Sequence, residues 1–410
     1  MPAANGPQDA RVDEDPGASV SGILVVPETG PETVPETAQK AAASARPGAD
    51  HEPASASDHD TFDPGELVAV CSRYDLGTIY QARVYRRGSR RSPKMVLDTE
   101  AGLLLLKRRA PRLGGAARVR FCHMVQKRLE QRGYPVAKLM LTRDGATCVY
   151  LHESAAGSGQ PAFAYEMFGF VNGKRFDRSP EAAAAAGRAL AGFHRNAADL
   201  HTAPSPDEAF KPPTTCFHGI GVVPQQLDML ATRLGRASEK TMRLCCGLRD
   251  AYSLARDEVD GLGFETWPTQ IIHGDWHPGN LVFRDRDIAA VLDLDSARLV
   301  PRVVDAASGA AQFSMTRSGL DPGAWPEGLD EPRLEAFLRA YDTSDGCVLS
   351  SVECRALPWL MIEAIIAEVV IPIAATGRFG AIEPIDMLRM VERKVEWIRQ
   401  RVERITGVLT

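Results

Sequence analysis

The sequence has no cysteine pattern that would hold a metal ion or a disulfide framework. Its eight cysteines contain no C-x-x-C spacing, and Cys245 and Cys246 are adjacent, which the geometry of an ordinary disulfide disfavours. These features argue against a zinc site and against a disulfide-stabilised secreted protein. We therefore expect a protein of the reducing cytoplasm.

Long uncharged hydrophobic runs and a secretory signal are also missing. The N-terminus has no basic residues ahead of an adequate apolar core. The most apolar stretch, residues 357–375, carries Glu363, Glu368 and Pro372, so we expect it to form a buried helix and not a membrane span.

Residues 1–60 contain no aromatic residue and are rich in alanine, proline and serine, with Pro-Glu-Thr repeated three times. They hold 11 acidic and 3 basic residues, so they account for more than the whole net charge of −5 and leave the remainder at about +3. Such a segment cannot bury enough apolar surface to offset the entropy lost on ordering. We predict an acidic disordered tail over residues 1–60.

The segments 273–280 and 291–295 supply the polar groups that chemistry on a phosphate needs. Phosphoryl transfer requires a hydroxyl aligned with the γ-phosphate and metal ions that neutralise the charge on the phosphate oxygens. The loop carboxylate of Asp275 can accept the hydroxyl proton. The amide oxygen of Asn280 and the carboxylate of Asp293 are hard ligands of the kind that magnesium prefers.

The spacing predicts how these ligands meet. The runs 280–284 and 288–294 have the composition of strands, and the polar residues 285–287 between them indicate a turn. A hairpin centred on residues 286 and 287 would place Asn280 opposite Asp293, where one ion can contact both side chains. Arg-Asp is not a favoured two-residue hairpin loop, so a slip of one position stays open.

Each residue also has an ordinary structural interpretation. An isolated aspartate in a loop is usually a turn former, and an isolated histidine near a strand end is usually a packed polar residue. The combination of His-x-Asp, an asparagine five residues later and an apolar strand with aspartate favours the metal–phosphate interpretation. We expect His273 to orient the loop, and His277 to be an exposed loop residue.

His273-Gly274-Asp275 with Asn280 and Asp293 resembles the catalytic segment of the aminoglycoside phosphotransferase, choline kinase and homoserine kinase-like superfamily, whose members share the protein-kinase-like fold. The resemblance implies that Asp275 is the catalytic base and that Asn280 and Asp293 bind Mg²⁺. It also implies that Asp295 belongs to the metal site as a supporting acid.

The same resemblance assigns Asp305 to a structural aspartate that follows the loop in relatives. A protein kinase is disfavoured, because Gly274 stands where the loop arginine would be. In addition, residues 294 and 295 are Leu-Asp in place of Phe-Gly. The segment therefore specifies the superfamily but does not specify the substrate.

A nucleotide clamp is expected upstream. Residues 78–85 and 95–98 have strand-like composition, and a turn between them contains Gly88 and Ser89, whose backbone N–H groups can face phosphates. The run 103–106 then forms a buried strand that ends in Lys107. By resemblance Lys107 is the nucleotide-phosphate lysine, and the alternative is a charged residue that ends a buried strand in water.

The clamp departs from the superfamily pattern in two places. The helix expected over residues 119–131 has only Glu130 as an acid, so either Glu130 pairs with Lys107 or no helix glutamate does. Residues 72–80 hold one glycine, so no G-x-G-x-x-G motif lies there.

A second nucleotide contact is expected where the chain runs between the predicted lobes. Residues 165–168, which include Glu166 and Phe168, resemble the hinge that holds adenine. The alternative is an apolar strand of ordinary core packing.

The basic segment 83–120 has 12 lysines and arginines against 2 acids, as a nucleic-acid-binding surface would. No RNA- or DNA-binding motif accompanies it, and a triphosphate site already explains part of the charge. We expect no nucleic-acid partner and keep such a protein as the third interpretation.

The region after residue 171 predicts helices. Ser179 and Pro180 are a good helix start, and His194 on the following alanine-rich run is interpreted as packing. Further helices are expected within 205–268 and over 332–343, 351–370 and 384–407. In relatives such helices shape the acceptor pocket. Glu363 and Glu368 would either pair with a basic residue or face a pocket and bind an ammonium group.

We therefore predict an α/β (α+β), protein-kinase-like bilobal fold. After the tail, residues 62–170 would form an N-terminal lobe with a small antiparallel sheet, and residues 171–408 a mainly helical C-terminal lobe. The predicted reaction is Mg²⁺-dependent transfer of the γ-phosphate of ATP or GTP to a small-molecule hydroxyl. A homoserine-like or choline-like metabolite leads as acceptor, with an aminoglycoside-type antibiotic second. The alternative is a catalytically weak nucleotide-binding or scaffold protein.

Overall fold

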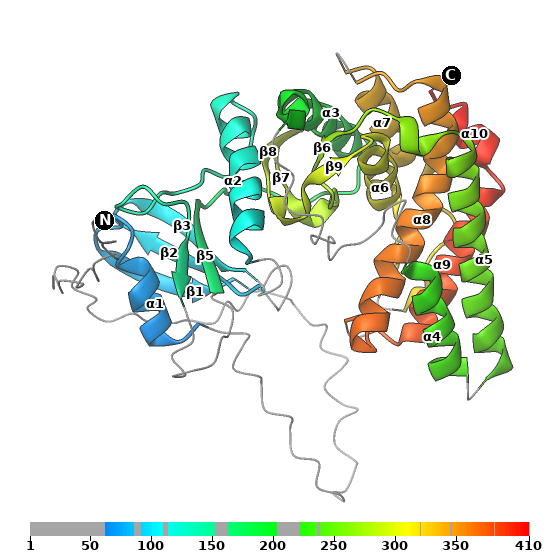
Figure 1. Cartoon of the computed structure of the whole chain (residues 1–410), viewed down its shortest axis with the longest axis horizontal. Helices are drawn as coiled ribbons and strands as arrows, with labels where there is room; N and C mark the ends of the chain where they lie inside the picture. The colour runs from blue at the N-terminus through cyan, green and yellow to red at the C-terminus, as the bar shows by residue number, and fades with distance from the viewer. Residues whose placement is uncertain are drawn as a thin grey trace, which may run out of the picture. The chain divides into compact units, whose positions relative to one another are not determined.

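The computed structural model describes residues 62–85, 92–109, 114–151, 163–202, 222–235, 238–319, 321–344, 347–380 and 382–409. The tail predicted over residues 1–60 and the phosphate-loop candidates Gly88 and Ser89 lie outside these residues. The described residues form two compact units, one within Met1–Pro111 and Met140–Phe170 and the other within Arg112–Leu139 and Val171–Thr410 (Figure 1). Residues 112–139 thus belong with the second unit, whereas the predicted division placed them in the first.

The first unit is an antiparallel sheet with one helix. The sheet order is β1-β2-β3-β5-β4, and its core includes Val70, Leu97, Leu106 and Met167. The elements are α1 (Pro64–Cys71), β1 (Ile79–Val84), β2 (Lys94–Thr99), β3 (Gly102–Arg108), β4 (Val149–Leu151) and β5 (Phe163–Gly169).

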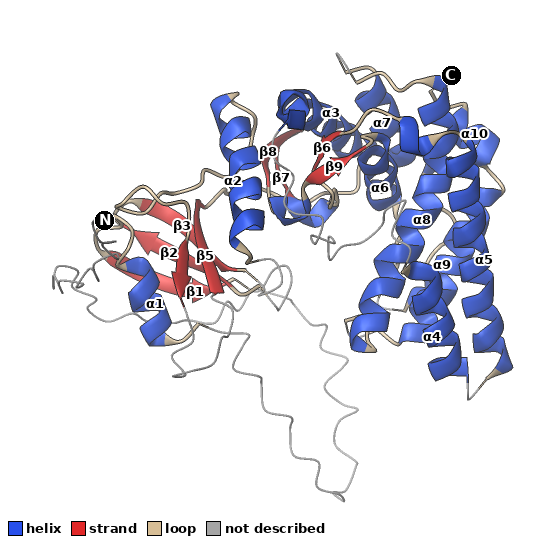
Figure 2. Cartoon of the chain, viewed as in Figure 1, coloured by secondary structure: helices blue, strands red, loops and turns tan. Residues whose placement is uncertain are grey.

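The second unit is mainly helical, with two small two-stranded sheets (Figure 2). Its helices are α2 (Ala116–Gln131), α3 (Pro180–Ala197), α4 (Val223–Gly235), α5 (Glu239–Gly261), α6 (Val303–Ser314), α7 (Glu331–Asp342), α8 (Ser351–Thr376), α9 (Pro384–Arg399) and α10 (Val402–Thr406). Its strands are β6 (Gln270–Ile272), β7 (Leu281–Arg284), β8 (Asp287–Val291) and β9 (Arg298–Val300).

Small residues let the core helices approach closely. The Ser179 side chain accepts a hydrogen bond from Ala182 N and so begins α3. On the alanine-rich face of α3, a Cβ added at Gly187 would lie 2.2 Å from the main-chain oxygen of Phe337 in α7. The two helices are therefore in near-backbone contact, which brings side chains of α7 next to those of α3.

The apolar helix α8 is a core helix of this unit. Among the described residues it is the one helix long and apolar enough to cross a membrane, and 78% of its most apolar window is buried inside the protein. It packs against α5, α6 and α9. Such burial is what a core helix shows, as predicted for residues 357–375.

Candidate active site

The loop between β6 and β7 carries the candidate catalytic residues, and one buried carboxylate holds its first turn. Asp305, in the first turn of α6, accepts hydrogen bonds from the backbone N–H of His273 at 2.7 Å and of Gly274 at 2.9 Å. Gly274 has φ +79°, and a Cβ there would lie 2.3 Å from the main-chain oxygen of Ser296. This position requires glycine, because the close backbone approach excludes a Cβ atom and the left-handed conformation disfavours one.

The imidazole of His273 connects two parts of the loop. Its Nδ1 accepts a hydrogen bond from Asp275 N at 3.2 Å, and its Nε2 donates to the main-chain oxygen of Leu292 at 3.0 Å. Since one nitrogen accepts and the other donates, the ring is neutral with its proton on Nε2. His273 is fully buried. These contacts agree with the expectation that His273 orients the loop.

Asn280 is bound directly to Asp275. Its Nδ2 donates to the main-chain oxygen of Asp275 at 2.9 Å and to the carboxylate Oδ2 at 3.0 Å. The amide nitrogen is thereby used, and the amide oxygen is left as the group that can bind a cation. The Asp275 side chain keeps 28% of its surface exposed, so a substrate can reach it.

The predicted hairpin forms, but its turn is centred one residue earlier than predicted. Arg284 pairs with Asp287 and Leu281 with Val291, so the turn consists of residues 285 and 286. A tight two-residue turn needs a positive φ, which Asp285 adopts at +56° and which an arginine at that position would tolerate less well. Moving the centre of the turn by one residue shifts each partner by two residues. A bulge between Val282 and Phe283 takes back one of these, so Leu281 pairs with Val291 and not with the predicted Leu292.

As a result Asn280 does not lie opposite Asp293. The main-chain oxygen of Asn280 accepts from Leu292 N at 2.9 Å, and Asp293 follows in the left-handed conformation with φ +62°. This conformation takes Asp293 out of the ladder, so the alternation of side chains along a strand no longer fixes its direction. The predicted cross-strand pair is therefore wrong.

His277 lies beside the carboxylate of Asp275. Its Nε2 lies 3.6 Å from Asp275 Oδ2, and its side chain is 36% exposed. Burial lowers the pKa of His277, but the charges of Asp275, Glu368 and Asp293 together outweigh it and raise that pKa above 6.5. We expected an exposed loop residue, and His277 is instead partly buried beside Asp275. The charge of Glu368 in α8 is one of those that act on His277.

Asp295 is held by an arginine that the sequence did not reveal. Its main-chain oxygen accepts from Arg118 Nε at 3.1 Å, and Arg118 belongs to the first turn of α2 and is buried. Glu130, the single acid of this helix, accepts from Leu139 N at 2.7 Å. Arg118 is separated from Asp295 by 177 residues, so no local pattern could have identified the pair.

In the first unit, Lys107 and Glu166 are directly opposite each other in the β3–β5 ladder, so their side chains share one face of the sheet. Both are buried, and Arg109 Nη2 binds Glu166 Oε1 at 2.8 Å. The carboxylate of Glu166 on β5 is therefore the neighbour of Lys107 in the sheet. The sequence did not predict this neighbour.

The expected hinge, residues 165–168, lies within β5 and pairs with β3. An apolar strand, the alternative interpretation, is thus what these residues form. Adenine binding by Glu166 and Phe168 stays a prediction.

The donor set of the second unit suits a hard divalent cation. Carboxylate and amide oxygens, as offered by Asp275, Asn280 and Asp293, are the ligands that Mg²⁺ prefers, and the orientation of Asn280 turns its oxygen away from Asp275. In the described part of the chain no group of three His, Cys, Asp or Glu side chains gathers as a metal site. A metal at this loop therefore depends on the amide of Asn280 as well as on carboxylates.

Comparison with known proteins gives a consistent result. A sequence model of the phosphotransferase enzyme family matches residues 82–347. No match was found among curated proteins.

Solved structures share the fold. An aminoglycoside phosphotransferase from Alicyclobacillus acidocaldarius is 20% identical, with a TM-score of 0.55 over 84% of this chain and 97% of its own. Amicoumacin kinase hAmiN, in complex with AMP-PNP, Ca²⁺ and Ami, is 14% identical, with a TM-score of 0.56 over 84% and 94%. A microcompartment-associated aminopropanol kinase is 13% identical, with a TM-score of 0.59 over 85% and 100%. The predicted fold class is confirmed.

Proposed function

Because this chain belongs to the phosphotransferase enzyme family, we propose that it transfers the γ-phosphate of ATP or GTP to a hydroxyl group of a small molecule in the cytoplasm. The observation that carries the proposal is the direct bond between Asn280 and the Asp275 carboxylate, in a loop held by Asp305. A base and an oxygen ligand are thus fixed within one short segment.

The reaction requires little covalent participation from the protein. The acceptor oxygen attacks the γ-phosphorus, the bond to the leaving nucleoside diphosphate breaks, and the acceptor proton passes to the Asp275 carboxylate. Asn280 holds that carboxylate by its Nδ2, so the base keeps one orientation while the substrate binds. Lys107, on the first unit, is the residue we assign to the nucleotide phosphates.

Asn280 and Asp293 would hold Mg²⁺ through oxygen atoms. When bound, the ion neutralises charge on the phosphate oxygens. The ligands of the structurally similar amicoumacin kinase, a nucleotide analogue and Ca²⁺, support the use of a nucleotide and a divalent cation here.

An acceptor that carries an amino group fits the site best. Glu368 is partly buried in α8, and its charge reaches His277 beside Asp275. A carboxylate so placed can bind an ammonium group next to the hydroxyl that receives the phosphate. The similar fold of an aminopropanol kinase supports this acceptor class, and an aminoglycoside-type antibiotic is the second choice.

The experiment is an acceptor screen for phosphate incorporation with ATP and GTP in parallel, run on the unmodified chain and on Asp275→Asn. Loss of the base should lower kcat by about 100-fold or more with an unchanged fold. Asp287→Asn is a suitable control, because Asp287 is exposed at the start of β8 in the same hairpin. Equal rates in Asp275→Asn and the unmodified chain would contradict the assignment.

A catalytically weak nucleotide-binding protein is the second candidate. It is favoured by one observation: Glu130, the single acid of α2, is engaged by the backbone of Leu139. Nucleotide binding without turnover for any acceptor, and without any effect of Asp275→Asn, would support this candidate over the first.

A further inference from the structure

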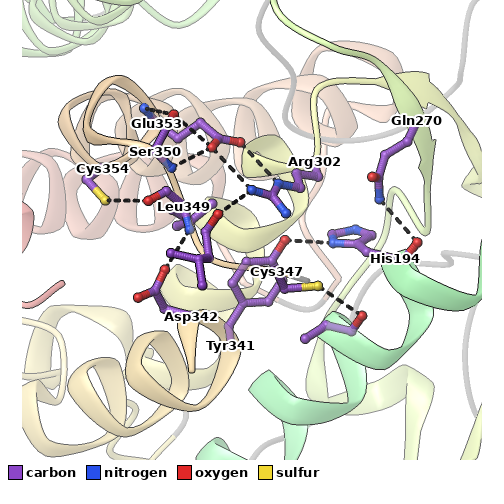
Figure 3. Close-up of polar contacts among 12 residues, drawn as sticks. His194, Gln270, Arg302, Tyr341, Asp342, Cys347, Leu349, Ser350, Glu353 and Cys354 are labelled. Atoms are coloured by element: carbon purple, nitrogen blue, oxygen red, sulfur yellow. Dashed lines mark hydrogen bonds and ion pairs between the residues drawn. The ribbon is translucent and has the colours of Figure 1, made fainter. Parts of the chain in front are cut away.

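A buried chain of hydrogen bonds extends from the catalytic loop to helix α7. Asp305 Oδ2, which accepts from His273 N, also lies 3.3 Å from His194 Nε2 of α3. The other nitrogen of that ring, His194 Nδ1, lies 2.8 Å from the hydroxyl of Tyr341 (Figure 3). His194, Asp305 and Tyr341 each have at most 1% of their surface exposed.

The charges decide which atom donates in each bond. Burial lowers the pKa of His194, so the ring is neutral at pH 7. Burial alone would raise the pKa of Asp305, but the bonds from His194 and from the loop backbone outweigh it and keep the carboxylate ionised. An ionised carboxylate can only accept, so His194 carries its proton on Nε2 and its Nδ1 must accept from the Tyr341 hydroxyl.

In the described part of the chain, His194 does not compete with another partner for the hydroxyl proton of Tyr341. Among the described residues, His194 is the one hydrogen-bond partner of that hydroxyl. The surrounding groups are engaged elsewhere: Arg302 binds the main-chain oxygen of Val348 at 2.5 Å and the carboxylate of Glu353, whose other bonds cap α8 (Figure 3). The Tyr341 hydroxyl therefore donates its proton to the imidazole ring of His194.

We propose that Tyr341 and His194 are positioning residues of this enzyme: the Tyr341 hydroxyl fixes the tautomer of His194, and His194 fixes the carboxylate that holds the catalytic loop. The expected change in kcat rests on the proposed function, whereas the expected tautomer of His194 is independent of that function. The loop depends on Asp305 because both of its first N–H groups bind that carboxylate. A carboxylate free to rotate would let Asp275 leave its aligned position, and small misplacements of a catalytic group are costly.

The test is Tyr341→Phe, which keeps the ring and removes one hydroxyl. We expect kcat to fall by about 10-fold, in the range seen when a partner that orients a functional ligand is lost, while KM for the nucleotide stays unchanged. Tyr134→Phe is the matched control. Its hydroxyl is also buried and bonded within the second unit, but to the main-chain oxygen of Ala189 at 2.7 Å.

A double-mutant cycle shows whether Tyr341 acts through His194. In a His194→Gln background, Tyr341→Phe should cause no further loss of kcat, because the two changes remove the same constraint. Independent losses that add, or equal losses of kcat in Tyr341→Phe and Tyr134→Phe, would overturn the proposal.

A spectroscopic measurement is independent of turnover. Long-range ¹H–¹⁵N spectra of the histidine rings should show His194 with its proton on Nε2 in the unmodified chain and a mixture of tautomers in Tyr341→Phe. The same single tautomer in both proteins would refute the role of Tyr341. A chain that shows the predicted tautomers but transfers no phosphate to any acceptor would instead count against the proposed function.

Discussion

At the scale of single residues, one buried carboxylate determines the geometry of the candidate site. Asp305 binds the backbone of His273 and Gly274, and the His273 ring then connects Asp275 to the residue before Asp293. The groups that would perform the chemistry are thus arranged around side chains that only position them.

The buried His194 should make the protein sensitive to acid. Because its pKa in the folded protein is below the ordinary value of 6.5, the unfolded chain takes up a proton that the folded chain does not. The free energy of unfolding therefore falls as the pH is lowered from about 6.5 towards that lowered pKa, and Asp305, whose pKa is also lowered, extends the loss to lower pH. His194 faces Asp305, Tyr341, His273 and Arg302.

Urea unfolding midpoints between about pH 8 and about pH 5 would measure this dependence. The His194→Gln variant has no titrating ring, so its midpoint should vary less over this range. An identical slope in the two proteins would contradict the assignment of the acid sensitivity to His194.

Glu368 should determine which acceptors bind. Removing its charge by Glu368→Gln should raise KM for amino-alcohol acceptors by about 10-fold or more, since a charged hydrogen bond contributes about 1.5–3 kcal/mol. KM for the nucleotide should stay the same. Steady-state kinetics with paired amino and non-amino alcohols would measure the difference. An equal rise for both kinds of acceptor would exclude recognition of an ammonium group.

At the scale of elements, the loop between β6 and β7 depends on a conformation that only glycine adopts without strain. Gly274→Ala combines a left-handed φ with a contact of 2.3 Å to the main-chain oxygen of Ser296. It should lower the free energy of unfolding by about 3 kcal/mol or more and abolish most activity.

Gly133→Ala is the control for this substitution. It also has a positive φ, of +68°, but no atom lies within 4 Å of the added Cβ. Its cost should be about 1–2 kcal/mol from backbone strain alone. Chemical denaturation of both variants gives the comparison, and equal losses would show that the contact with Ser296 relaxes easily.

Local patterns predicted the elements well because the signals are short-range. Ser179 with Pro180 begins α3 as expected, and the strands around Lys107 form a sheet. The register of the β7–β8 hairpin could not be obtained in this way, because it depends on the positive φ of Asp285 and on a bulge. Pairing residues at equal distances from the centre of the polar turn was therefore the wrong way to predict the register.

Contacts between distant segments account for the rest of the site. Arg118 meets Asp295 across 177 residues, and His194 meets Tyr341 across 147. A buried histidine on an apolar helix face is usually a packing residue. No pattern in the sequence identifies the residues that His194 contacts. The motif therefore indicated the loop, and the resemblance indicated Asp305, but neither indicated the partners Arg118 and Tyr341.

At the scale of the whole molecule, bound ligands should stabilise the fold by mass action. Nucleotide with Mg²⁺ at about 100 times the dissociation constant should add about 2.7 kcal/mol to the free energy of unfolding and raise Tm. Chelation of the metal should remove most of the rise, and Asp293→Asn should show little of it, while Asp287→Asn should respond like the unmodified chain. A full rise in Asp293→Asn would contradict metal binding by Asp293.

The path of the chain through its two units has a consequence for how the protein is made. The ribosome releases α2 before β5, yet β5 lies between β3 and β4 in the finished sheet, and α2 packs on α3, which is made later still. During synthesis neither unit can complete its fold until later segments are made. The first unit needs β4 and β5, which follow α2, and α2 needs α3. Apolar residues of α2 such as Phe121 and Leu129 are then exposed until α3 emerges. Nascent chains stalled before residue 180 should therefore recruit chaperones more strongly than chains stalled after residue 200.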